Sequence, residues 1–247
     1  MARLNQERGT RGRGIRFRRY LAQERILIVI LPGKPHERLH LNLYLEIWGA
    51  IFSMGLRDAW SNNGSTRFFR GQGHPSGDGA NRDGDGGEPD SSGNPRLQRR
   101  GMDAWPTLII EAGDSSTLAD LLRDMRWWFS ASDHQVKIVL LVKLDRPGRR
   151  ILLEKWVGTM PPNPRPGPVT RATSSSTLPQ PNRSQGITIH WTPGMAADIP
   201  ASHIVTSGDL RLEFDLLFLR PPSPTEDDII ITIPRLQEWA STVWEIV

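Results

Sequence analysis

Apolar and polar positions divide the chain into strand-like and helix-like segments. Uninterrupted apolar runs bounded by Pro, Gly or charged residues predict buried strands, because a strand covered on both faces shows no polar side. Such runs, and apolar-rich segments with a few interspersed polar or charged residues, occupy residues 26–31, 108–110, 136–144, 151–156, 187–191, 210–219 and 229–233. Apolar positions that recur at helical spacing predict helices over 37–56, 115–130 and 234–246.

The strongest strand signal runs from Trp105 to Gly113, where Leu108-Ile109-Ile110 leads directly into Glu111. A buried carboxylate without a partner costs several kcal/mol, so Glu111 should stand at the end of the strand. A metal ion, an arginine or water could each compensate its charge there. From this stretch alone all three alternatives stay open.

The helix after this strand has a clear start, because Thr117 and Asp120 have the spacing of a capping box. The apolar runs at 136–144 and 151–156 follow, and the Pro-Gly turn between them predicts a β-hairpin. The order strand, helix, strand, strand indicates a mixed sheet with a right-handed crossover.

The composition divides the 247 residues into one sizeable domain with irregular additions. Residues 1–19 form an Arg/Gly-rich tail that we expect to be disordered. Residues 20–157 form the core, interrupted by a Gly- and Asp-rich mobile loop at 71–87. A Pro/Ser-rich loop at 158–186 then leads to strands and a helix at 187–247, which complete the same domain.

The charge of the chain is mildly basic, with a net charge of +4 and a pI near 9.9. This permits contact with nucleic acid without requiring it. The absence of cysteine excludes disulfides and thiolate zinc sites, and favours an intracellular protein, cytoplasmic or nuclear. The Arg-rich, nearly acid-free segment from Arg3 to Arg25 also fits a mitochondrial transit peptide. Apolar runs are too short to span a bilayer, so we expect no membrane partner; protein partners stay unknown.

Two carboxylates stand where a hydrolytic metal site needs them. Asp90 precedes a polar link and Glu111 ends the apolar strand. Two carboxylates from neighbouring strands can hold Mg²⁺, which polarises a phosphate and activates water. Pro89-Asp90 followed by Glu111-Ala112-Gly113, a helix and a strand resembles the PD-(D/E)xK restriction-endonuclease-like superfamily.

A second resemblance is more specific. The segments 105–113, 127–128, 136–144 and 154–156 are similar in order and composition to a family of uncharacterised fungal proteins, over roughly residues 39–157. Together the resemblances imply an α/β fold of the restriction-endonuclease-like type, with a mixed β-sheet flanked by helices and long disordered loops. For an active enzyme they imply Mg²⁺-dependent cleavage of nucleic-acid phosphodiesters, with Asp90 and Glu111 binding the metal and Glu46 completing the carboxylate set.

The chain departs from the superfamily pattern at one position, because Gly113 stands where a lysine follows the glutamate by two residues. Some relatives supply that lysine from the next helix, but here Asp124 aligns with it. Arg123 or Lys137 would then have to replace it, and arginine does not transfer protons near neutral pH. Three functions remain open: a degenerate pseudo-enzyme that binds nucleic acid or protein, which we favour slightly; a Mg²⁺-dependent nuclease; and a structural domain of unknown role.

Histidines offer little from spacing alone. Of the six, only His36 and His40 are separated by four residues, at the start of a predicted helix. No third ligand is recognisable near them in the sequence, so we interpret this pair as chance.

Overall fold

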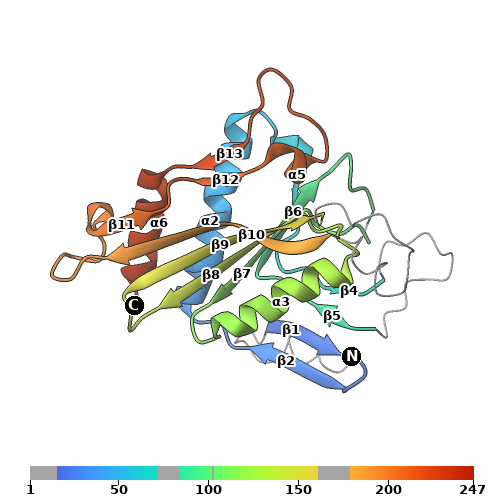
Figure 1. The fold of residues 1–247 in the computed structure, drawn as a ribbon, viewed down its shortest axis with the longest axis horizontal. Helices are drawn as coiled ribbons and strands as arrows, with labels where there is room; N and C mark the ends of the chain where they lie inside the picture. The colour runs from blue at the N-terminus through green and yellow to red at the C-terminus, as the bar shows by residue number, and fades with distance from the viewer. Residues whose placement is uncertain (1–15, 72–83, 102, 161–178) are drawn as a thin grey trace, which may run out of the picture.

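The structure is a computed structural model that describes residues 16–71, 84–101, 103–160 and 179–247. Its largest feature is a seven-stranded sheet with the order β11-β10-β9-β8-β7-β6-β3 (Figure 1). The strands are β3 (Trp60–Asn62), β6 (Ser91–Pro95), β7 (Leu108–Gly113), β8 (Ile138–Asp145), β9 (Arg150–Thr159), β10 (Gln180–Trp191) and β11 (His203–Thr206). Strands β7 and β8 are parallel, and the other neighbouring pairs in this sheet are antiparallel.

Helix α3 (Leu118–Ala131) connects the two parallel strands. It begins at the predicted capping box, in which Thr117 accepts a hydrogen bond from the Asp120 amide and the Asp120 side chain accepts one from the Thr117 amide. Strands β8 and β9 form the predicted hairpin. Its register places Leu141 beside Glu154, and Leu141 is also paired with Glu111 of β7.

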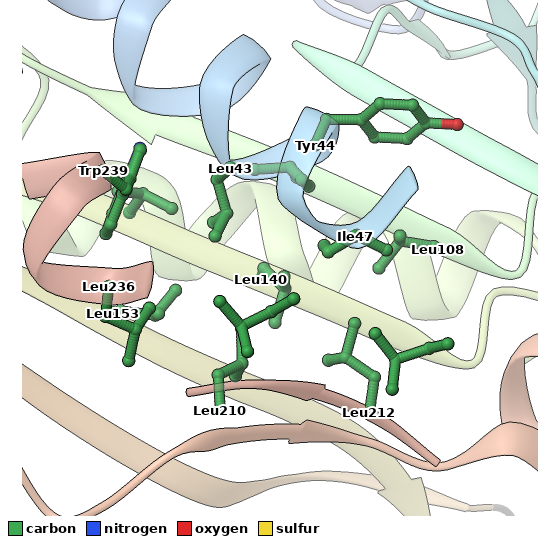
Figure 2. Close-up of a cluster of buried hydrophobic side chains, with 14 of the residues drawn as sticks. Leu43, Tyr44, Ile47, Leu108, Leu140, Leu153, Leu210, Leu212, Leu236 and Trp239 are labelled. Carbon is green, nitrogen blue, oxygen red and sulfur yellow. The ribbon is translucent and has the colours of Figure 1, made fainter. Parts of the chain in front are cut away.

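One face of the sheet is covered by helices α2 (Lys34–Ser53) and α6 (Ile233–Trp244), which lie in contact with each other (Figure 1). The small sheet of β12 (Leu210–Leu212) and β13 (Ile229–Ile231) and the short helix α5 (Phe214–Phe218) complete this layer. Figure 2 shows leucines of α2, α6, β12 and the central strands meeting in one cluster. Each fully buried leucine contributes about 1.5–3 kcal/mol of hydrophobic stabilisation.

The other face carries α3 and a smaller apolar cluster that includes Ile109, Trp128 and Leu141. A second sheet, with the order β2-β1-β5-β4, lies at this side of the molecule (Figure 1). Its strands are β1 (Arg16–Leu21), β2 (Ile26–Ile30), β4 (Phe68–Phe69) and β5 (Gly86–Gly87). Two short 3₁₀ turns, η1 (Arg57–Ala59) and η3 (Pro200–Ser202), lie outside both sheets. Within the described ranges, no helix combines the length and the apolar character needed to cross a bilayer.

The predicted fold class is confirmed at the level of a mixed α/β sheet flanked by helices. The single strand predicted over 210–219 is wrong, because it divides into β12 and α5. Phe214, Leu217 and Phe218 are all buried, and their i, i+3, i+4 spacing is that of a helix face. The apolar run concealed this change of period.

The predicted tail also ends earlier than expected. Residues 16–19 belong to β1 rather than to a disordered segment, because their arginines pair with buried carboxylates of distant elements. The rest of that tail, at 1–15, lies outside the described residues, as do 72–83 of the predicted mobile loop and 161–178 of the Pro/Ser-rich loop. The end of the first loop forms β5.

Candidate functional site

Asp90 and Glu111 lie beside each other in the sheet, because the residues after Asp90 form strand β6 and not the predicted polar link. Asp90 directly precedes β6, whose Ser91 pairs with Ile110 of β7, so that Asp90 lies across from Glu111. Asp90 Oδ2 accepts a hydrogen bond of 2.8 Å from the amide of Ala112, the residue after Glu111. Both carboxyl groups are buried.

Glu111 faces helix α3. Its Oε1 accepts a hydrogen bond of 2.5 Å from the indole nitrogen of Trp128. Burial raises the pKa of Glu111 well above its usual range, and the negative charges of Asp90 and Asp124 raise it further, while Arg18 and Arg19 oppose the shift. This environment favours the protonated form of Glu111.

Asp90 has the opposite character. Its Oδ1 lies 3.1 Å from His36 Nε2 and 3.3 Å from Arg16 Nη1. Burial alone would raise the pKa of Asp90, but the hydrogen bond with His36 and the charges of His36, His40 and Arg16 outweigh burial and lower it to about 2. Asp90 is therefore an ionised carboxylate at neutral pH, whereas burial shifts the pKa of the neighbouring Glu111 upward.

Strand β1 supplies the cations of this region. Arg18 Nε donates to Asp124 Oδ2 over 2.6 Å, and Arg19 Nη2 donates to Asp124 Oδ1 over 2.9 Å. The Arg19 guanidinium also lies 3.7 Å from the ring centroid of Trp127, in a cation–π contact. The sequence resemblance implies a helical lysine near the position of Asp124, and Asp124 here binds two arginines.

The other residues proposed from the sequence make contacts that lead away from Asp90 and Glu111. Arg123 is an exposed side chain that pairs with Asp120 on the surface of α3. Lys137 Nζ donates to the carbonyl of His134, before β8 begins. Glu46 pairs with Arg235 of α6.

Gly113 is closely packed, so a side chain at this position would require its neighbours to shift. A Cβ there would lie 3.1 Å from Leu121 Cδ1 and 3.2 Å from the carbonyl oxygen of Ser116. Lys143 is paired with Gly113 across the parallel strands, and its Nζ donates to the carbonyl of Asp114 over 2.6 Å. The sequence pattern missed Lys143 because its position beside Gly113 depends on the register of β7 and β8.

The interpretation of His36 and His40 as a chance pair without a third ligand is wrong, because Asp90 lies beside them. One ligand atom from each of His36, His40 and Asp90 lies within 4.8 Å of the others, and all three residues are buried. The signal was present in the sequence as His36-Glu37-Arg38-Leu39-His40, which has the H-E-x-x-H spacing of a helical metal site. The third ligand lies 50 residues beyond His40 along the chain, so only the fold could reveal it.

A cleft of about 350 Å³ opens beside His36, between the end of β2 and the starts of helices α2 and α3. It is lined by Val29, Ile30, Leu31, Pro32, Gly33, His36, Asp114, Ser115 and Ser116. Two helix N-termini therefore contribute to one concave surface. The dipoles of the two helices make such ends favourable places for anions.

Comparison with known proteins gives little further guidance. No protein family model and no curated protein matches the chain. Among solved structures, the chain is similar to a protein from Anabaena variabilis described as a "putative nuclease belonging to DUF820". The TM-score is 0.39 and the identity 11%, over 60% of this chain and 81% of the other. A likeness at this level is too weak to support an inference about function.

Proposed function

We propose that the chain is a restriction-endonuclease-like protein that binds nucleic-acid phosphates without cleaving them. The order of its elements supports this kinship: an antiparallel series β3-β6-β7 follows α2, and the parallel strand β8 follows α3. The positions of Asp90 before β6 and of Glu111 on β7 support the assignment of these two carboxylates.

The hypothesis of a protein without nuclease activity rests first on the arginine pair of β1. Arg18 and Arg19 are buried and bind Asp124 on the side of the sheet where Glu111 lies. Mg²⁺ requires a near-octahedral set of oxygen ligands, of which the carboxylates should be ionised. Glu111 Oε1 accepts the Trp128 indole N–H, and Asp90 Oδ1 already faces His36 and Arg16. Gly113 also stands where the resemblance implies a lysine. The residues present therefore do not fit a Mg²⁺ ion between Asp90 and Glu111.

The cleft supports binding of phosphate. Ser115 and Ser116 precede helix α3 and line the cleft, and Arg18 Nη1 donates to Ser116 Oγ over 2.8 Å. Hydroxyl groups, helix N-termini and a neighbouring guanidinium are the groups that bind phosphate oxygens in proteins. The net charge of +4 favours approach of a polyanion.

Cleavage is tested by incubating supercoiled plasmid and labelled RNA with the full chain and Mg²⁺, beside a Glu111→Gln variant. We expect both proteins to leave the substrates intact. Mg²⁺-dependent cleavage that disappears in Glu111→Gln would contradict the proposal.

Binding is tested by fluorescence anisotropy with DNA and RNA oligonucleotides over a series of salt concentrations. We expect the affinity to fall steeply with salt, as counterion release requires. A Ser115→Glu variant places negative charge in the cleft and should weaken binding by ~10-fold or more. Ser53→Glu, on an exposed position at the end of α2, is the matched control and should bind almost normally. Equal affinities of the two variants would remove the cleft from the proposal.

A second candidate function is an active nuclease that uses Lys143 in place of the missing lysine. It is favoured by one observation, the pairing of Lys143 with Gly113 on adjacent strands. If cleavage is found, Lys143→Met should abolish it, while Lys137→Met should retain it because Lys137 donates to the carbonyl of His134 instead. Equal loss in both variants would exclude this role for Lys143.

A further inference from the structure

Arg16 places one guanidinium nitrogen at the centre of a polar cluster formed by helix α2 and the residue before β6. Its Nη1 lies 3.2 Å from His40 Nε2, 3.3 Å from Asp90 Oδ1 and 3.3 Å from Glu37 Oε1. A positive charge is therefore bound at the point where the side chains of two histidines and an aspartate converge. The guanidinium marks this point as a cation site built by the fold.

The two histidine rings are held in place by contacts with their neighbours. His40 Nδ1 lies 2.9 Å from Ser91 Oγ, which leaves Nε2 directed toward the Arg16 guanidinium. The His36 ring stands edge-on to the His40 ring, with the centroids 5.3 Å apart. Hydrogen bonds to the second ring nitrogen, such as that with Ser91, fix the tautomer and the direction of a metal-binding histidine.

We propose that His36, His40 and Asp90 bind a transition-metal dication of the Zn²⁺ class, and that Arg16 is the cation that competes with it. Two of the three donors are imidazole nitrogens, which suit Zn²⁺, Co²⁺ and similar ions rather than Mg²⁺ or Ca²⁺. The two histidines are one helical turn apart on α2, which is the spacing that lets both reach one ion. Asp90 supplies the oxygen ligand from the sheet.

The proposed site is buried and lies beside the cleft that His36 lines. Three protein ligands leave the fourth position of a tetrahedral ion open. His36 lines the cleft of about 350 Å³, which gives a small ligand or water a route to that position. Glu37 is half-exposed, and its Oε2 lies 3.3 Å from His40 Nε2, so a carboxylate stands beside the proposed ion.

This inference goes beyond the proposed phosphate binding and does not depend on it. The two share only the neighbourhood of the cleft, since the metal ligands exclude Glu111, Ser115 and Ser116. Loss of oligonucleotide binding would leave the metal site intact, and loss of metal binding would leave the phosphate proposal intact.

The first test uses the full chain, stripped with a chelator and titrated with Co²⁺ and Zn²⁺. We expect each protein molecule to bind one metal ion. Isothermal titration calorimetry measures the binding of both metals, and visible absorption measures the binding of Co²⁺. His36→Gln and His40→Gln should each weaken binding by ~10-fold or more. His190→Gln is the matched control, because His190 is exposed on β10 and outside the cluster. Binding that is unaffected by the two cluster variants would overturn the proposal.

The second test is a gain of affinity, which a folding defect cannot imitate. Arg16→Gln removes the competing cation and should tighten Co²⁺ binding by ~10-fold or more. Arg25→Gln, an exposed arginine in the turn after β1, should leave the affinity unchanged. If neither the parent protein nor a folded Arg16→Gln variant binds Co²⁺ or Zn²⁺ at micromolar concentration, the cluster is not a metal site.

Discussion

The two faces of the central sheet differ in what they bury. Alternate residues of the same strands, such as Leu108 and Ile110, face α2 and α6 and contribute to a continuous apolar cluster (Figure 2). On the face that α3 covers, the next strand residue after Ile109 with the same orientation is Glu111. Asp124 of α3 and the arginines of β1 lie near Glu111 on this face. The face covered by α2 and α6, here called the apolar face, carries the larger apolar cluster. The α3 face, here called the charged face, combines a smaller apolar cluster with the ion pairs of Asp124.

This difference between the two faces indicates that stability alone does not explain the residues of the charged face. Buried ion pairs lose solvation on folding, and apolar side chains of similar volume often stabilise a fold as well or better. The apolar face shows that this chain can build a dense core. Its buried charges are concentrated where α3, β1 and Asp90 meet, so that region is the best candidate for function.

The largest effect should come from breaking the charged face. Asp124→Asn leaves Arg18 and Arg19 buried without a carboxylate, which should lower the free energy of unfolding by about 3–5 kcal/mol. Chemical denaturation measures the change. Asp198→Asn, at an exposed position, is the control and should change it little. A loss below about 1 kcal/mol would mean that the arginines stay solvated or find other partners.

The apolar face should respond to volume rather than charge. In Gly93→Ala the new Cβ would lie 2.6 Å from both Trp60 Nε1 and Tyr44 Oη, so these rings must move. Overpacking of this kind costs about 1–3 kcal/mol. Gly49→Ala adds the same methyl group to an open, exposed position of α2 and should stabilise by about 0.5–1 kcal/mol. Thermal unfolding that shows the same sign for both variants would contradict this description.

The pH dependence of Glu111 tests whether the charged face holds a proton. Burial raises the pKa of Glu111 above 4.5, so the folded state binds this proton more tightly than the unfolded state does. The resulting contribution to stability is present below about pH 4.5 and is lost as the pH rises toward the folded pKa. Glu111→Gln keeps an acceptor for Trp128 and removes the titration. Its stability relative to the parent should therefore rise with pH from 4.5 upward, and a difference that is constant with pH would exclude the raised pKa.

The smallest effect is expected at a residue that the sequence pattern favoured. Arg123→Ala removes an exposed ion pair on α3 and should change stability by no more than about 0.5 kcal/mol. Thr117→Ala, at the capping box of the same helix, should cost about 1 kcal/mol. The two variants compared by denaturation separate a surface charge from a structural cap. A loss of oligonucleotide binding in Arg123→Ala alone would return this residue to the functional site.

Local patterns in the sequence determined the central strands β7, β8 and β9, the hairpin between the last two, and the capped helix α3. These features follow from periodicity, turn residues and strand order, all of which act over short stretches of chain. The predicted strand over 210–219 failed for a related reason, because an apolar run alone does not distinguish a strand from a short buried helix.

Tertiary structure alone decided which charges meet. Arg18 and Arg19 bind Asp124, which is more than 100 residues away along the chain. His36 and His40 of helix α2 lie beside Asp90, which directly precedes strand β6. The pairing of Lys143 with Gly113 likewise depends on strand register. The spacing of charged residues along the sequence does not predict which of them form pairs, because Coulomb interactions depend on distance in space and on burial. Hydrophobic periodicity determined the framework of this protein, and the fold then selected the groups that form its site.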